Sequence, residues 1–189
     1  MSTLSSPDVL RRTGGKRIRS IVYDEATIAR RVAELGREIG DAYPDGDLLV
    51  LGLLKGSFIF LGDLVRQIER PLQVDFLVAS SYGSKKVSSG VVRLLYDPET
   101  EVAGKHILLV EDIIDSGKTL RRLTALLGER QPRSFAICAL LDKQLAPPPE
   151  PPAELRFVGF RAPPAFLVGY GLDHAENYRH LPFIADLDS

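Results

Sequence analysis

The sequence predicts an α/β fold, with a central parallel sheet flanked by helices, and three observations support this prediction. Strand-like apolar runs alternate with stretches of helical spacing, an order typical of parallel sheets. Two of these runs, Asp47–Leu54 and His106–Val110, are almost continuously apolar, as strands covered on both faces are. The chain also has the composition of an ordinary globular protein, with 44% hydrophobic and 26% charged residues.

The first elements are a strand over Ile18–Tyr23 and the helix that follows it. Asp24 can cap the amino end of this helix, because its carboxylate can accept a hydrogen bond from an unpaired backbone amide. Apolar side chains then recur at helical spacing, at Ile28, Val32, Leu35 and Ile39. We expect the helix to end near Tyr43 and Pro44.

The later elements repeat this alternation. We expect strands over Asp47–Leu54, Leu72–Ser80, Val91–Tyr96, His106–Val110 and Ser134–Leu141, and helices over Phe58–Ile68 and Lys118–Leu127. Ser81–Ser89 is polar and weakly patterned, as a mobile loop would be. Ala146–Ala153 reads APPPEPPA and predicts a stiff surface connection, because proline lacks the amide donor that a helix or central strand needs. Leu155–Ser189 predicts further strands or loops beside the main sheet.

The length of 189 residues predicts one compact domain. We assign residues 17–189 to this domain and residues 1–16 to a flexible N-terminal tail, which contains Ser, Thr, Gly and Arg but no apolar run of signal-peptide length. Elsewhere no apolar run approaches the roughly 20 residues that a membrane-spanning helix needs. We therefore expect neither secretion nor membrane insertion.

The charge balance argues against a nucleic-acid-binding protein. Lys and Arg total 24 and Asp and Glu total 25, and a net charge of -1 gives no global field that would gather nucleic acid. Any anion-binding site must therefore be local. The single cysteine, Cys138, cannot form an internal disulfide and lies in an apolar run, which predicts a buried thiol and fits a cytoplasmic location.

Residues with chemical potential concentrate in Leu108–Leu120, which reads LLVEDIIDSGKTL. Parallel sheets bind ligands beyond the carboxyl ends of their strands, and three carboxylates follow the predicted strand there, on Glu111, Asp112 and Asp115. The residues Ser116–Thr119 then open a helix, whose unpaired amides and two hydroxyls would cradle a phosphate. Carboxylates can accept hydrogen bonds from sugar hydroxyls or help to hold a divalent cation. A phosphorylated sugar satisfies both kinds of group.

Two other nucleotide-binding motifs do not fit the sequence. Gly117–Thr119 matches the end of a P-loop, but the first glycine of that pattern would fall at Asp112, whose charge would repel phosphates. Gly169 begins a dinucleotide fingerprint whose last glycine would fall at His174. The structural alternative is a strand-to-helix turn in which a serine or an aspartate only caps the helix, and the preceding acidic cluster argues against it.

The segment EDIIDSGKT resembles the phosphoribosyl pyrophosphate motif of the type I phosphoribosyltransferases, and it is most similar to their hypoxanthine-guanine branch. The resemblance covers most of the chain from about Ile21. Segments that match in the family's order are GLLKGSF at Gly52–Phe58, SSYG at Ser80–Gly83, ALLDK at Ala139–Lys143, and Phe157–Leu181. The resemblance implies the type I phosphoribosyltransferase fold, in which chain-terminal segments form a small hood beside the central sheet.

The resemblance also implies roles at the sugar phosphate. The backbone that would hold the 5′-phosphate belongs to Asp115, Ser116, Gly117, Lys118 and Thr119. Glu111 and Asp112 would contact the ribose hydroxyls. Asp115 would in addition exchange a proton with N7 of a purine, a catalytic role that needs a carboxylate within hydrogen-bond reach of the base.

Four further residues match groups that handle pyrophosphate. Lys55 and Gly56 match a loop whose backbone amides bind the leaving group and in which a non-proline cis peptide is expected. Arg179 matches an arginine that binds pyrophosphate, and Asp173 matches an acid that holds magnesium on the pyrophosphate side. The implied metal ligands are thus Glu111, Asp112 and Asp173. Without the resemblance, Asp173 and Arg179 would be interpreted as surface charges and Lys55-Gly56 as a simple turn.

The base side of the implied site comes from two later segments and a loop. Lys143 follows a predicted strand, where its ammonium could donate to O6 of a 6-oxopurine and would disfavour a 6-amino group. Phe166 matches an aromatic residue that stacks on the purine, and Leu167 matches a residue whose backbone lines the other edge of the base. From the sequence alone, both would be assigned to the core. Ser81 and Tyr82 match a mobile loop that closes over the site.

The implied reaction is transfer of the phosphoribosyl group from phosphoribosyl pyrophosphate to N9 of hypoxanthine, and of guanine, with magnesium as cofactor. The reaction belongs to purine salvage, and we expect a homodimer or a homotetramer. One alternative is a regulator of the same fold that binds nucleic acid, against which the charge argues. Another is a transferase for a different base such as xanthine, which would share the sugar site and differ in the base pocket.

Overall fold

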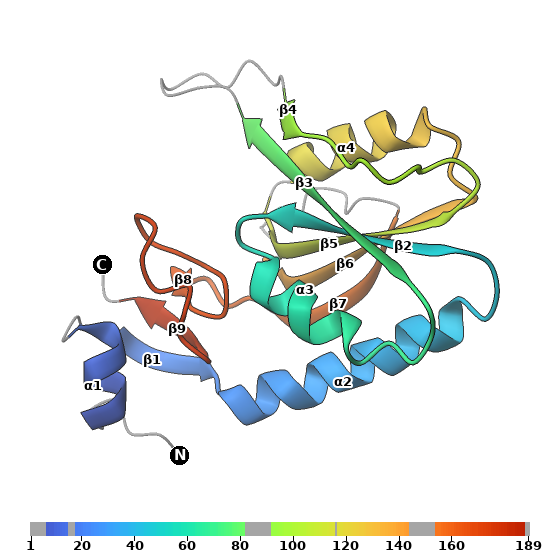
Figure 1. Ribbon diagram of the computed structural model, residues 1–189. Helices are drawn as coiled ribbons and strands as arrows, with labels where there is room; N and C mark the ends of the chain where they lie inside the picture. The colour runs from blue at the N-terminus through green and yellow to red at the C-terminus, as the bar shows by residue number, and fades with distance from the viewer. Residues whose placement is uncertain (1–6, 15–17, 82–91, 116, 144–153, 188–189) are drawn as a thin grey trace.

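A computed structural model describes residues 7–14, 18–81, 92–115, 117–143 and 154–187. It confirms the predicted α/β fold. A six-stranded, mostly parallel sheet has helices on both of its faces, and a smaller sheet built from the two ends of the chain lies beside it (Figure 1).

The main sheet has the strand order β4-β3-β2-β5-β6-β7. Its strands are β2 (Leu48–Leu54), β3 (Gln73–Ser81), β4 (Val92–Tyr96), β5 (His106–Ile114), β6 (Ser134–Asp142) and β7 (Leu155–Arg161). Each neighbouring pair is parallel except β3 and β4. Because β2 and β5 are parallel neighbours at the centre, the segments that follow their carboxyl ends emerge at the same edge of the sheet.

Both faces of the main sheet are covered by helices. These helices are α2 (Glu25–Ala42), α3 (Phe58–Val65) and α4 (Lys118–Gly128). In β5, Leu108 and Val110 join the core formed with α2 and α3, whereas Ile107 and Leu109 join the core formed with α4. Successive side chains of a strand point to opposite faces, so a strand that is buried on both faces must be apolar at every position.

The helix α2 has the amino end and the buried stripe that the sequence predicts. The Asp24 carboxylate accepts a hydrogen bond from the Thr27 amide at 2.8 Å and so caps the helix. All four predicted stripe residues are buried, namely Ile28, Val32, Leu35 and Ile39. The helix ends at Ala42, next to its C-cap Tyr43.

The two ends of the chain form a three-stranded antiparallel sheet, and we call this sheet, together with residues 169–183 that connect β8 to β9, the hood. Its order is β1-β9-β8, with β1 at Ile18–Tyr23, β9 at Ile184–Leu187 and β8 at Leu167–Val168. The hood lies beyond the carboxyl end of β2 (Figure 1). It has its own apolar cluster, which includes Val9 of the short helix α1 (Pro7–Thr13). Residues 7–13 are thus helical, with a buried valine, where we expected a flexible tail.

The structure also changes two element boundaries. The strand β5 continues to Ile114 rather than ending at Val110, because β6 remains paired with it as far as Asp142. Glu111 and Asp112 therefore lie within the strand rather than after it. The helix α3 ends at Val65 instead of Ile68.

None of the described helices is long and apolar enough to cross a membrane. The proline-rich run 146–153 and residues 82–89 of the predicted mobile loop lie outside the described residues.

Candidate active site at the carboxyl edge of the sheet

Three parts of the chain form most of the lining of a cavity of about 340 Å³ at the carboxyl edge of the main sheet. They are the end of β2 with the loop that follows it, the segment from the end of β5 into α4, and the hood residues Asp173 and Arg179. The predicted site residues among the lining are Lys55, Gly56, Glu111, Asp112, Asp115, Gly117, Lys118, Thr119, Asp173 and Arg179. The volume suits a small-molecule ligand. The structure thus brings together the residues predicted for the sugar phosphate, for magnesium and for pyrophosphate.

The start of α4 has the features of an anion-binding helix terminus. Gly117 precedes Lys118 and has a φ of 67°, a left-handed conformation that glycine adopts at little cost. Glycine has no side chain with which to cap the helix, so the amides of the first turn stay available to a bound anion. Lys118 and Thr119 line the cavity at this point. Ser116 lies outside the described residues.

The two acids near the end of β5 have different surroundings. Oε2 of Glu111 is buried without a hydrogen-bond partner among the described residues. Burial, and then the neighbouring Asp112 carboxylate, raise the pKa of Glu111 well above its usual value. Asp112 instead accepts a hydrogen bond from the Ile113 amide at 2.7 Å. A buried carboxyl oxygen without a partner at the wall of a cavity can be satisfied by a hydroxyl of a ligand.

Two glycines let the three parts of the chain around the cavity approach one another closely. A side chain at Gly56 would overlap Oδ2 of Asp112, and a side chain at Gly171 would overlap the carbonyl oxygen of Gly56. Gly171 also has a φ of 101°. The loop after β2 is therefore held between β5 and the hood. The cis peptide that we expected in this loop joins Leu54 to Lys55, one bond before the Lys55-Gly56 pair that the sequence indicated.

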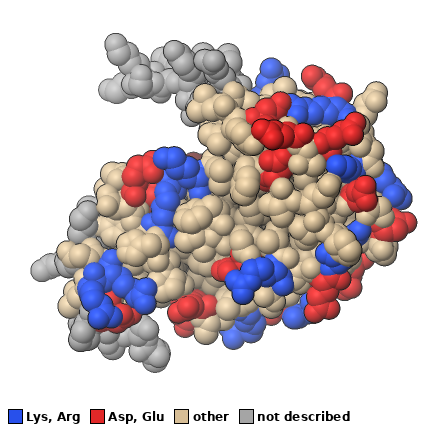
Figure 2. All heavy atoms as spheres, in the orientation of Figure 1, with Lys and Arg blue, Asp and Glu red and all other residues tan. Residues whose placement is uncertain are grey.

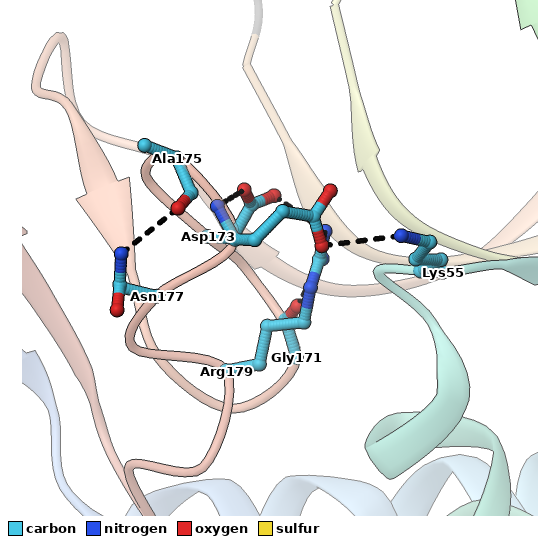
Figure 3. Close-up of polar contacts among 7 residues, drawn as sticks. Lys55, Gly171, Asp173, Ala175, Asn177 and Arg179 are labelled. Atoms are coloured by element: carbon cyan, nitrogen blue, oxygen red, sulfur yellow. Dashed lines mark hydrogen bonds and ion pairs between the residues drawn. The ribbon is translucent and has the colours of Figure 1, made fainter.

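The hood presents a cluster of opposite charges to the loop after β2 (Figure 3). Nη2 of Arg179 lies 2.8 Å from Oδ1 of Asp173, and Nη1 donates to the Gly171 carbonyl at 2.8 Å. Oε2 of Glu176 lies 3.3 Å from Nη2 of Arg179 and 3.2 Å from Nζ of Lys55. The side chains of Lys55 and Arg179, two residues predicted at the pyrophosphate side of the site, are thus linked through one carboxylate.

The predicted metal ligands share the cavity without forming a ready-made metal site. Glu111, Asp112 and Asp173 all line it, yet the described residues contain no group of three His, Cys, Asp or Glu side chains that could hold a metal ion. The two carboxylate oxygens of Asp173 already contact Arg179 and the Glu176 amide. Magnesium commonly binds to one or two carboxylates together with substrate phosphates and water, and this arrangement fits such a site.

Two of the three predicted base-binding residues line a second cavity, of about 380 Å³. Lys143 and Phe166 meet there with two residues that sequence reasoning missed, Arg19 and Asp186. Phe166 is 50% exposed and packs edge-on against His174, with ring centroids 5.3 Å apart. It is therefore not the core residue that the sequence alone would predict, and its exposure suits stacking on a flat ligand.

The three remaining residues predicted for the base and the mobile loop are buried or only partly described. Leu167 is buried in β8 and pairs with Asp186 of β9. Ser81 is the last residue of β3, and only its backbone is described. Tyr82 lies outside the described residues.

The missed residues differ in the signal that could have revealed them. Glu176 lies three positions before Arg179 in the segment GLDHAENYR, so a search for acids near the predicted cations would have found it. Arg19 and Asp186 lie at opposite ends of the chain and meet through the pairing of β1 with β9, where Nη1 of Arg19 is 3.5 Å from Oδ2 of Asp186. No local pattern indicates such a pair.

A model of the protein family described as "Phosphoribosyl transferase domain" matches residues 19–173. The chain belongs to this phosphoribosyl transferase family. The matched span includes the end of β5, α4, Lys143, Phe166 and Asp173, while Arg179 lies beyond it.

Relatives with closely similar sequences carry more specific names. The chain is 48% identical over 166 residues to the hypoxanthine phosphoribosyltransferase of Salmonella typhimurium, which covers 87% of this chain and 92% of that protein. It is 45% identical over 170 residues to the hypoxanthine-guanine phosphoribosyltransferase of Bacillus subtilis, covering 90% and 93% of the two chains.

Solved structures of the phosphoribosyl transferase family share the fold. A hypoxanthine phosphoribosyltransferase from Staphylococcus aureus matches with a TM-score of 0.86 and 34% identity, over 98% of this chain and 97% of that one. A hypoxanthine-guanine phosphoribosyltransferase from Bacillus anthracis matches with a TM-score of 0.84 and 39% identity, over 91% and 100% of the two chains. These similarities confirm the predicted family and its fold.

Proposed function

We propose that the chain is a hypoxanthine phosphoribosyltransferase of purine salvage. It transfers the 5-phosphoribosyl group of phosphoribosyl pyrophosphate to N9 of hypoxanthine, and of guanine, and releases pyrophosphate and a nucleoside 5′-monophosphate. The observation that carries this proposal is the single cavity that joins the acids of β5, the start of α4 and the cations Lys55 and Arg179. A phosphorylated sugar that carries pyrophosphate needs each of these groups.

In this proposal the β5–α4 segment binds the sugar phosphate. The amides at the start of α4 and the Thr119 hydroxyl hold the 5′-phosphate, with Lys118 adding positive charge. Glu111 and Asp112 accept hydrogen bonds from the ribose hydroxyls, and the high pKa of Glu111 fits a carboxyl group that awaits a polar partner. The same wall therefore binds both the hydroxyls and the 5′-phosphate of the sugar.

The opposite wall binds the leaving group. The backbone of Lys55 and Gly56 and the guanidinium of Arg179 contact pyrophosphate. Glu111, Asp112 and Asp173 would hold magnesium together with substrate oxygens, and the bound ion would neutralise the charge that develops on pyrophosphate. Asp173 and Arg179 are already paired at 2.8 Å, so the acid and the cation are positioned together.

The purine binds beside Phe166, with its 6-oxo group toward the Lys143 ammonium. The backbone of Leu167 lines another edge of the base. Asp115, at the wall of the first cavity, exchanges a proton with N7, so that the N9 that attacks the sugar is the nucleophilic form. The loop that begins at Ser81 and Tyr82 closes over the reacting groups and excludes water from the sugar cation.

We also propose that the enzyme is a cytoplasmic homodimer or homotetramer. Four exposed apolar side chains lie on the neighbouring strands β3 and β4, at Val74, Phe76, Leu95 and Tyr96. Exposed apolar side chains on paired strands are suited to contact with a second copy. The buried free thiol of Cys138 is in keeping with a reducing compartment. Light scattering of the purified protein would measure the number of subunits.

A steady-state assay with phosphoribosyl pyrophosphate and magnesium tests the proposed reaction. Hypoxanthine, guanine, xanthine, adenine and uracil are supplied in turn, and nucleotide and pyrophosphate are both measured. We expect turnover of hypoxanthine and guanine and none of adenine or uracil. Absence of turnover with every 6-oxopurine would contradict the proposal. A preference for xanthine would reassign the base.

Acidic and basic side chains are interspersed over the face shown in Figure 2, and the net charge is -1. Nucleic-acid-binding regulators concentrate positive charge on one surface. This distribution favours the enzyme.

A further inference from the structure

The carboxylate of Glu176 joins two cations that belong to different parts of the molecule. Lys55 follows β2 of the main sheet, and Arg179 belongs to the hood (Figure 3). Oε2 of Glu176 lies 3.2 Å from Nζ of Lys55 and 3.3 Å from Nη2 of Arg179. One carboxylate oxygen thus contacts both side-chain cations that face the pyrophosphate side of the cavity.

The turn that carries Glu176 is held by several hydrogen bonds. The Glu176 amide donates to Oδ2 of Asp173 at 2.8 Å, and His174 and Asn177 pair through backbone hydrogen bonds of 3.2 and 3.1 Å. Nδ2 of Asn177 also donates to the Ala175 carbonyl at 2.8 Å. Ala175 and Glu176 have φ values of 52° and 63°, a left-handed conformation that non-glycine residues rarely adopt. These contacts keep the Glu176 side chain beside Lys55 and Arg179.

An ionised carboxylate and a phosphate group both have negatively charged oxygens that accept hydrogen bonds from the N–H groups of these cations. Hydrogen bonds from Lys55 and then Arg179 lower the pKa of Glu176, so that it is ionised at neutral pH. An anion that binds to both cations must therefore displace Glu176 or share the donors with it.

We propose that Glu176 is a positioning residue that competes with pyrophosphate for Lys55 and Arg179. This inference rests on the proposed function, which assigns Arg179 and the backbone of Lys55 to pyrophosphate, and it adds the Lys55 ammonium to them. When the site is empty of pyrophosphate, Glu176 holds the cations near each other across the boundary between the main sheet and the hood. When pyrophosphate binds, its oxygens replace the carboxylate. Glu176 thereby weakens the affinity for pyrophosphate and favours its release as a product.

The substitution Glu176→Gln tests this competition, because it removes the charge and keeps the size of the side chain. The dissociation constant of inorganic pyrophosphate is measured by calorimetry in the presence of magnesium, on the full-length protein. We expect roughly threefold to tenfold tighter binding, since the two contacts are exposed and exposed ion pairs are individually weak. Unchanged or weaker binding of pyrophosphate would overturn the proposal.

Two controls separate competition from other effects of the substitution. Glu69→Gln makes the same change of net charge at an exposed site outside the cavity, and it should leave the affinity for pyrophosphate unchanged. In a Lys55→Gln background, Glu176→Gln should improve the affinity by a smaller factor than in the wild type. An equal improvement in both backgrounds would contradict a competition that involves Lys55.

A third measurement distinguishes failure of the inference from failure of the proposed function. The affinity of inosine 5′-monophosphate, which would bind through the start of α4, should be the same in the wild type and in Glu176→Gln. Absence of pyrophosphate binding to the wild type would refute the proposed function itself. If Glu176→Gln unfolds, Glu176→Ala carries the same prediction for pyrophosphate, with thermal unfolding as the check on the fold.

Discussion

The two walls of the cavity are built in different ways. The sugar-phosphate wall, from Glu111 to Thr119, comes from one continuous strand-to-helix segment in the middle of the main sheet. The facing wall contains Asp173 and Arg179, and the hood to which they belong depends on the pairing of β1 with β9 at opposite ends of the chain. A wall that is local in the sequence is fixed by the geometry of one strand and one helix. A wall assembled from distant segments can vary in its contacts without changing the sheet.

The largest effect is expected for the acid at the junction of β5 and α4. Asp115→Asn should lower kcat by about 10²- to 10⁴-fold, because an amide cannot exchange the proton with the purine. The dissociation constant of phosphoribosyl pyrophosphate should change little, since the backbone at this position is unaltered. Steady-state kinetics and equilibrium binding measure the two quantities separately. Equal losses in kcat and in binding would show that Asp115 holds the sugar phosphate instead of acting on the base.

The next largest effect concerns the base. Lys143→Gln should lower kcat/KM for hypoxanthine by roughly 10- to 100-fold, because a charged hydrogen bond to the 6-oxo group contributes about 1.5–3 kcal/mol. The discrimination between hypoxanthine and adenine should shrink by a similar factor. The measurement is kcat/KM for each base at saturating phosphoribosyl pyrophosphate. Unchanged discrimination would remove Lys143 from base recognition.

A third prediction tests the close packing, within the facing wall, of the loop after β2 against the hood. Gly171→Ala should lower the free energy of unfolding by about 1–3 kcal/mol, because its φ of 101° and its contact with the Gly56 carbonyl leave no room for a side chain. Gly40→Ala is the matched control, since it lies within α2 and the added group would meet no atom within 4 Å apart from its chain neighbours and the backbone of its own helix. That control should stabilise the protein by about 0.5–1 kcal/mol. Urea denaturation measures both, and equal effects at the two glycines would contradict the close packing.

The smallest effect is expected at the opposite end of β5. Burial, and then the charge of Arg133, lower the pKa of His106 from its ordinary value of 6.5. Below pH 6.5 the unfolded chain takes up a proton that the folded chain does not, so this histidine removes stability as the pH falls from 6.5 toward its folded pKa.

His106→Gln should therefore reduce the loss of stability between pH 7.5 and 5.5 by under about 1 kcal/mol, as expected for a partly exposed group. Catalytic rates at pH 7.5 should be unchanged, because this end of the sheet faces away from the cavity. A large loss of activity in His106→Gln would contradict the claim that this end of β5 lies away from the active site. Urea denaturation at the two pH values provides the measurement.

The sequence predicted the main sheet and the sugar-phosphate wall because both depend on local patterns. The apolar runs in the sequence predicted the positions of β2 and β5. The acids before Gly117 indicated a ligand site at the edge of the sheet where these strands end. The predicted carboxyl end of β5, at Val110, was wrong because a strand can contain acidic residues where it borders a cavity. That tolerance depends on the tertiary structure.

The facing wall could be predicted only through the resemblance to the phosphoribosyltransferases. Nothing in the spacing of Asp173 and Arg179 distinguishes them from surface charges, and Glu176 was missed although it contacts Arg179. Arg19 and Asp186 meet only after the hood has formed. The exposure of Phe166, which suits it to stacking, is likewise decided by tertiary packing rather than by its apolar character.

The division of labour between the two walls is tested most directly by calorimetric titration of two variants with two ligands, ribose 5-phosphate and magnesium pyrophosphate. Thr119→Val should weaken the binding of ribose 5-phosphate and leave pyrophosphate unaffected. Arg179→Gln should weaken the binding of pyrophosphate by roughly tenfold or more, since it removes a charged hydrogen bond, and leave ribose 5-phosphate unaffected. If each variant weakened the binding of both ligands equally, the two walls would not be separate binding sites, and this result would contradict the proposed division of labour.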